Sequence, residues 1–157
     1  LRNYGQSTRY HHPEIGMNSR LDEIQAALLS ERLKWLEKFN DRRRQIAQRY
    51  FEEIKNPLIQ HLAKPQEQSA HVYHLFVLTC PWRDQLIEHL RQSKIQTLIH
   101  YPIPIHLQRS SQSLKWDPAG LASSETHAET CLSIPCHPQM NDDDIEDVID
   151  TVNCFQA

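Results

Sequence analysis

The chain has 157 residues, of which 39% are hydrophobic, and a formal net charge of -3 at pH 7. This length suits one domain with a real core, and the apolar content excludes a chain that is disordered by composition. The charge balance excludes the strongly basic surface typical of nucleic-acid-binding proteins, and no stretch is long and apolar enough to cross a membrane. We expect a cytoplasmic protein, because no secretory signal is visible either.

Residues 1–18 are expected to form an irregular linker. Gly5, Pro13 and Gly16 punctuate a segment that is rich in Tyr and His, and this composition is typical of a loop. Such a packed, aromatic loop is unusual at a free terminus, and no Met precedes Leu1. We therefore expect the segment to connect to a larger domain that would lie before Leu1.

A long amphipathic helix is expected from Ser19 to about Ile54. Its apolar residues recur at the helical spacings of three, four and seven: Leu21, Ile24, Leu28, Trp35, Leu36, Phe39, Ile46, Tyr50 and Ile54. Ser19 is the expected N-cap, with Asp22 as its capping-box partner. A bend or break is expected near residues 39–41, where helix propensity falls, and Asn56-Pro57 ends the helix.

The second half of the chain predicts a small layer of helices and strands. Strands are expected at residues 72–78 and 95–101 with a helix over 83–93 between them, and this order implies a crossover connection. A short helix over 123–131 leads into an extended segment, and a final helix begins after Asn141.

The stretch between the long helix and this layer is polar with two prolines, and it predicts a surface loop through Ser69. The predicted fold class is α/β (α+β), a long N-terminal helix followed by a small helix-and-sheet layer. Together they would form one small domain over residues 19–157.

The four cysteines are expected to be reduced. Cys80, Cys131, Cys136 and Cys154 form no Cys-x-x-Cys pair. A zinc site using Cys131, Cys136 and His137 is the alternative, but zinc ligands usually come in more tightly spaced pairs. Burial as small hydrophobic residues accounts better for Cys80 and Cys131, so no metal ligand is assigned.

The turn before the long helix holds the best candidate ligand contacts. The first N–H groups of a helix are unpaired and lie at its positive dipole end, so that Asn18 and Arg20 beside them could hold a phosphate. The alternative is a capped helix in which Arg20 pairs with Asp22 or Glu23. Spacing alone favours this second interpretation.

Three stretches carry a family resemblance. They are Leu1-Arg2-Asn3-Tyr4-Gly5-Gln6 with Arg9-Tyr10 and residues 16–28, residues 100–108 (HYPIPIHLQ), and residues 132–138 (LSIPCHP). In this order, over nearly the whole chain, they resemble the sugar aminotransferases of the DegT/DnrJ/EryC1/StrS family. The resemblance implies a pyridoxal phosphate (PLP) enzyme of the aspartate-aminotransferase fold. Such enzymes work as homodimers on nucleotide-linked keto sugars, with an amino acid as amine donor.

The resemblance covers the C-terminal part of the family only, so the large domain with the Schiff-base lysine would lie before Leu1. It also implies roles for single residues. Members place an asparagine just before the long helix against the PLP phosphate of the neighbouring subunit, and this position is Asn18 here. Arg20 in the same pattern would serve the phosphate, the substrate or Asp22. Tyr101 and His106 lie on the stretch that faces the substrate in the family, as loop residues beyond strands often do.

Ordinary structural roles are the alternatives for these residues. Asn18 would bond its own turn, Tyr101 would be an aromatic at the edge of the core, and His106 would be a surface or hydrogen-bonded histidine. His100 is expected on the opposite face of the strand from Tyr101. Residues 109–121 lack the glycine-rich pattern of the family, so no particular sugar is predicted.

No lysine has the setting of the family's lysine motif. The six lysines lie on a solvated helix face, at element ends or in loops: Lys34, Lys38, Lys55, Lys64, Lys94 and Lys115. We therefore assign no catalytic residue and expect the chain alone to be inactive. Two other hypotheses stand beside the aminotransferase domain: a non-catalytic remnant that self-associates, and, less favoured, a metal-binding domain.

Overall fold

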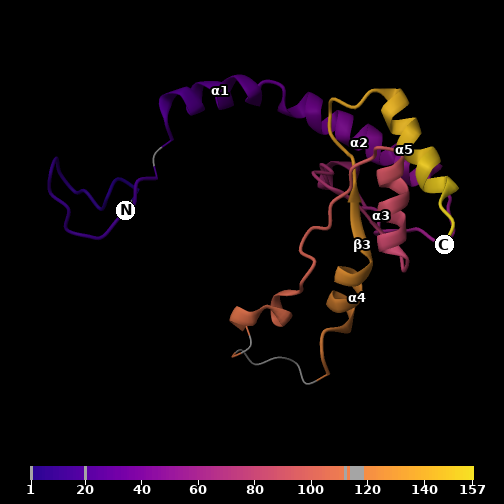
Figure 1. The fold of residues 1–157 in the computed structure, drawn as a ribbon. Coiled ribbons are helices and arrows are strands. Elements are labelled where there is room, and N and C mark those ends of the chain that lie inside the picture. Colours follow the sequence, from indigo (N-terminus) through magenta and orange to yellow (C-terminus); the bar gives the residue numbers. More distant parts are fainter. Residues whose placement is uncertain (1, 20, 112, 114–118) are drawn as a thin grey trace. The chain divides into compact units, whose positions relative to one another are not determined.

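The computed structural model describes residues 2–19, 21–111, 113 and 119–157 (Figure 1). In these ranges it has the expected α/β fold, with five α-helices and a three-stranded sheet. The helices are α1 (Glu23–Leu33), α2 (Leu36–Glu53), α3 (Arg83–Gln92), α4 (Ala122–Thr130) and α5 (Asp142–Cys154), and the strands are β1 (Gln60–His61), β2 (Phe76–Thr79) and β3 (Cys131–Ile134). The chain divides into two compact units, residues 1–38 and 39–157. The domain boundary expected at residue 18 stays a prediction.

The first unit begins with a loop that folds back on itself. The Tyr4 N–H donates to the Met17 carbonyl at 3.0 Å, and Asn3 and Asn18 form an antiparallel bridge. Gly5 is buried inside this loop at φ +68°, where a Cβ would stand 1.9 Å from a backbone carbonyl oxygen. Only glycine fits such a position, so Gly5 is required for the loop to close.

Helix α1 begins later than the sequence predicts. Asp22, rather than Ser19, is the N-cap residue, and its side chain makes no capping hydrogen bond. The reason is the loop pairing, because the Ser19 N–H donates to the Arg2 carbonyl at 2.8 Å. None of the α1 residues is buried in the structure.

The predicted position of the helix break is also wrong. The helix breaks at residues 34–35, where the Trp35 N–H bonds back three residues to the Arg32 carbonyl at 3.0 Å. Residues 39–41 stay helical within α2. Asp41 accepts a hydrogen bond from Arg44 at 2.8 Å, one turn on, and this pair supports the helix where its propensity is low.

The second unit is built on the antiparallel sheet β1-β2-β3. Strand β1 lies in the stretch that was expected to be a surface loop, and its two residues pair with the end of β2. An edge strand this short carries no readable periodicity. Strand β2 is shorter than the predicted 72–78, because Tyr73 at φ +48° interrupts the extended chain.

The strand predicted over residues 95–101 is wrong. Leu98 forms only an isolated bridge with Ser133, through two backbone hydrogen bonds of 2.8 and 3.1 Å. Positive φ angles at Lys94 (+62°) and Tyr101 (+60°) bound the segment and keep its extended part short. Both pairings of β3 are antiparallel, so the Leu98 segment runs in the direction of β2 with β3 between them. The expected crossover through α3 is therefore present.

The helices of the second unit lie close to their predicted positions. Figure 1 shows α3 and α5 side by side, and the two helices contact each other. Helix α5 starts with a capping box, in which the Asn141 side chain accepts the Asp144 N–H at 2.7 Å and the Asp144 carboxylate accepts the Asn141 N–H at 3.1 Å. Local signals of this kind are what sequence reading detects best.

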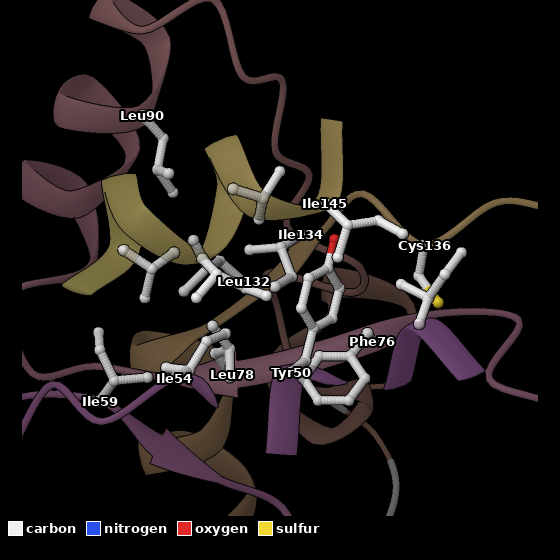
Figure 2. Packing of buried hydrophobic residues seen from close by; sticks show 14 of the residues in the cluster. Tyr50, Ile54, Ile59, Phe76, Leu78, Leu90, Leu132, Ile134, Cys136 and Ile145 are labelled. Atoms are coloured by element: carbon white, nitrogen blue, oxygen red, sulfur yellow. The ribbon is translucent and has the colours of Figure 1, made fainter. Parts of the chain in front are cut away.

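The core lies between α2, the sheet and α5 (Figure 2). Tyr50 is fully buried, with its ring edge against Phe76 at 5.0 Å between centroids. Its hydroxyl donates to the Pro135 carbonyl at 2.7 Å. Leu132 of β3 and Ile145 of α5 are also fully buried in this cluster. The aromatic body of Tyr50 thus fills the core while its polar end has a partner.

Candidate functional site

Asn18 lies on the loop of the first unit, shortly before α1. Its side chain is exposed, and its backbone is held by the bridge to Asn3. The pairing continues on the next residue, where Ser19 bonds to Arg2. The backbone of the residue that the family resemblance singled out is therefore held within the loop that precedes α1 in the chain.

The start of α1 has one feature that favours a phosphate and one that opposes it. The Asp22 side chain does not cap the helix, so the first N–H groups lack the side-chain acceptor that usually occupies them. Asp22 and Glu23 are nevertheless negative, and their charge opposes an anion at this end. A phosphate here needs added positive charge. Arg20, the second residue expected at this site, lies outside the described residues.

Tyr101 and His100 lie in different environments, although they do not occupy opposite faces of a strand, because residues 95–101 form no strand. The Tyr101 side chain is highly exposed, with 86% of its surface accessible, and its backbone has a φ of +60°. His100 is half-buried, and its Nδ1 lies 2.9 Å from the hydroxyl oxygen of Ser133, which is itself buried. The sequence gives no sign of this His–Ser pair, because the two residues meet only through the pairing of Leu98 with β3.

His106 lies in the short 3₁₀ turn η2 (Ile105–Leu107). Its Nε2 lies 2.9 Å from the carboxylate oxygen Oε1 of Glu125, and only 10% of the His106 side chain is exposed. This contact matches the hydrogen-bonded histidine that the sequence left open as an alternative, and it does not test a substrate role. Glu125 was missed, because it comes from α4 and no local pattern links the two positions.

An open groove of about 1540 Å³ runs along β3 in the second unit. Parts of α3 and α5, residues 93–98 and His100 line it. Neither Tyr101 nor His106 is among the lining residues. The volume of the groove exceeds that of the usual site for a small molecule, and the groove does not bring Tyr101 and His106 together.

Three of the four cysteines are buried as ordinary core residues, and Cys154 is exposed. Cys80 and Cys131 are buried, which confirms their expected role as small hydrophobic residues. Cys136 is buried too, and burial raises the pKa of its thiol to about 11, which disfavours the thiolate that a metal would need. Among the described residues, no group of three or more His, Cys, Asp or Glu side chains could hold a metal ion.

None of the helices in the described part of the chain combines the length and the apolar character that crossing a bilayer requires.

Comparison with known proteins gives a family. The model of the DegT/DnrJ/EryC1/StrS aminotransferase family matches residues 1–153. The chain is 44% identical over 155 residues to a dTDP-3-amino-3,6-dideoxy-alpha-D-galactopyranose transaminase from Aneurinibacillus thermoaerophilus, and the match covers 99% of this chain and 42% of that relative. The chain therefore spans about two fifths of the length of this curated relative.

Solved structures agree with this match. The crystal structure of S. venezuelae DesV in complex with a ketimine intermediate is similar with a TM-score of 0.86 and 37% identity, over 98% of this chain and 41% of that one. A DegT DnrJ EryC1 StrS aminotransferase from Brucella abortus is similar with a TM-score of 0.84 and 32% identity, over 96% and 40%. Sequence and fold therefore agree over almost every described residue, and the chain belongs to the DegT/DnrJ/EryC1/StrS aminotransferase family.

Proposed function

We propose that the chain is the C-terminal domain of a PLP-dependent aminotransferase that transfers an amino group from an amino acid to a nucleotide-linked keto sugar. The family match over residues 1–153 carries this proposal. The 44% identity to a dTDP-sugar transaminase supports a nucleotide-sugar substrate, and the 42% share of that relative supports a further domain in the complete enzyme. The proposal includes a cytoplasmic location, as the composition predicts.

The Schiff-base lysine is proposed to lie in that further domain. When bound, PLP supplies the carbonyl group that takes up the donor's amine and passes it to the sugar. A lysine that reacts with it needs an apolar or electropositive setting, whereas the five described lysines are all exposed: Lys34, Lys38, Lys55, Lys64 and Lys94. Lys115 lies outside the described residues. The chain on its own is therefore proposed to be inactive, with no catalytic residue.

Asn18 and Arg20 are the proposed contacts to the phosphate of PLP, reached from the neighbouring subunit of a homodimer. The uncapped start of α1 beside Asn18 supports this role. Arg20 would supply the positive charge that offsets Asp22 and Glu23. Both residues would bind and orient the cofactor rather than take part in proton transfer.

Tyr101 and His106 are the proposed contacts to the nucleotide sugar. Tyr101 is highly exposed on a segment stiffened by Pro102 and Pro104, so its hydroxyl and ring can meet a ligand with little loss of backbone entropy. His106 is held by its hydrogen bond to Glu125. The exposed ring and the held imidazole would then orient the sugar.

The experiment that tests the cofactor contact uses the complete enzyme. Asn18→Ala is expected to weaken PLP binding about tenfold to a hundredfold, because a hydrogen bond to a charged group contributes about 1.5–3 kcal/mol. Arg20→Ala is expected to have a smaller or substrate-dependent effect. Asn40→Ala, in α2, is the matched control. PLP affinity is measured by titrating the cofactor-free enzyme, and equal affinities for Asn18→Ala and the parent would refute the role.

A second candidate is a non-catalytic remnant that self-associates. The observation that favours it is the apolar surface of α1, where Ile24 and Leu28 keep 77% and 62% of their surface exposed. Exposed apolar area of this kind tends to associate, so both candidates predict a dimer or larger species in which the apolar face from Leu21 to Phe39 packs against another copy. Light scattering at micromolar concentration tests this, and a monomer mass would contradict it.

Activity separates the two candidates. Co-expression with the lysine-bearing part of the enzyme is expected to restore PLP binding and transamination of a nucleotide-linked keto sugar. If the assembled protein binds PLP and remains inactive with every amino donor tested, the remnant is the better description.

A further inference from the structure

We propose that Glu125 is a positioning residue for His106, whose carboxylate sets the orientation and the tautomer of the imidazole ring. The geometry of the pair comes from the structure, and the substrate role of His106 rests on the proposed function. His106 Nε2 and Glu125 Oε1 are 2.9 Å apart, which is a normal hydrogen-bond distance. The pair therefore meets the geometric requirement for one residue to hold another.

Burial makes this hydrogen bond important for the ring. Only 10% of the His106 side chain is exposed, against 42% for Glu125, so the ring has little access to water. A polar ring atom withdrawn from water is nearly always paired with protein, and a bond to an ionised carboxylate is stronger than one to a neutral acceptor. An ionised carboxylate only accepts, so the shared proton belongs to Nε2 of His106.

The two residues come from different elements, a helix and a short turn. Glu125 lies in the first turn of α4, where Arg83 donates to the Ala128 carbonyl at 2.7 Å and Ala128 itself is buried. His106 lies in η2, whose backbone is closed by a 3.0 Å bond from the Leu107 N–H. A helix joined to Arg83 thus presents the carboxylate to a ring on a hydrogen-bonded turn.

A ring whose plane and tautomer are set in advance loses less entropy when a ligand binds. If His106 contacts the nucleotide sugar, loss of Glu125 should therefore weaken the binding of that sugar. A loss of binding common to the ground state and the transition state raises KM and leaves kcat nearly unchanged. The binding of the amino-acid donor should be unaffected.

The first test needs no activity and uses the 157-residue chain. Ring ¹⁵N chemical shifts of His106 report which nitrogen carries the proton. We expect the Nε2-protonated form in the parent, an averaged form in Glu125→Ala, and the parent form again in Glu125→Gln, whose side-chain oxygen can still accept. Glu129→Ala on the exposed side of the same helix is the matched control. An unchanged His106 ring in Glu125→Ala would overturn the proposal.

The second test uses the complete enzyme. Glu125→Ala is expected to raise KM for the nucleotide sugar about tenfold with kcat and the donor KM near the parent values, and Glu125→Gln to recover most of the loss. In a His106→Ala background, Glu125→Ala should add nothing. Additive effects, or equal effects on both substrates, would overturn the positioning role. If His106→Ala alone leaves the sugar KM unchanged, the substrate role in the proposed function fails, while the ring shifts still decide the positioning.

Discussion

Replacing Asn56 with alanine should destabilise the second unit strongly. Asn56 follows α2 and keeps only 7% of its surface exposed. Its amide nitrogen donates to the Val152 carbonyl at 2.9 Å and to the Phe155 carbonyl at 2.8 Å, and its side-chain oxygen accepts the Leu58 N–H at 2.9 Å. One side chain therefore joins the end of α2 to the end of α5.

The size of the effect follows from the groups that would lose their partner. Val152 lies in the last turn of α5 and Phe155 is its C-cap, and the Val152 carbonyl also accepts the Phe155 N–H at 3.3 Å, so the groups that would lose their partner are chiefly the Phe155 carbonyl and the Leu58 N–H. A buried polar group left unsatisfied costs about 1–3 kcal/mol, and water reaching part of the site reduces the sum. We expect Asn56→Ala to lower the free energy of unfolding by about 3 kcal/mol, a large part of the 5–15 kcal/mol typical of a domain.

Urea unfolding followed by circular dichroism measures this loss. Gln48→Ala is the matched control, since Gln48 is an exposed amide on α2 that bonds Glu52 at 2.9 Å, and its loss should change stability by less than about 0.5 kcal/mol. Asn56→Asp keeps the shape and the acceptor but turns the donor into an oxygen that faces carbonyls, so it should be at least as damaging at pH 7. A loss below about 1 kcal/mol for Asn56→Ala would refute the reasoning.

Three further predictions concern protonation. Burial lowers the pKa of His61. The neutral imidazole therefore stabilises the fold above the ordinary pKa of about 6.5, and this stabilisation is lost as the pH falls. The urea midpoint of His61→Phe should depend less on pH than that of the parent between pH 7.5 and 5. Arg42 lowers the pKa of Asp142, so that this ion pair stabilises the fold above about pH 4 and the stabilisation decreases as the carboxylate is protonated. The free energy of unfolding of Asp142→Asn should therefore fall less in acid than that of the parent. Burial raises the pKa of Cys136 to about 11, so iodoacetamide at pH 8 should label exposed Cys154 first and Cys136 only in denaturant, as mass spectrometry would show.

The sequence predicted the elements whose signals are local. The apolar spacing of α3 and the Asn141 cap of α5 lie within a few residues of the structure they specify, and both helices were placed closely. The same holds for Gly5 as a loop residue, because its missing side chain is itself the signal. The family, too, was recognised from three motifs in order and then matched over residues 1–153.

Pairing and packing decided the rest, because they depend on residues far apart in the chain. Residues 95–101 have strand propensity, but Leu98 alone bridges to β3, since the backbone turns at Lys94 and Tyr101. The helix broke at residues 34–35 rather than 39–41, and within α2 an ion pair between Asp41 and Arg44 supports the helix where its propensity is low.

The candidate site shows the same division. The family resemblance proposed ligand contacts at Asn18, Arg20, Tyr101 and His106, and these roles stay predictions. It did not reveal Glu125 or the Ser133 partner of His100, because α4 and β3 reach those histidines only after the chain has folded. A side chain's neighbours across the fold determine its tautomer and its exposure, and the sequence does not encode those neighbours locally.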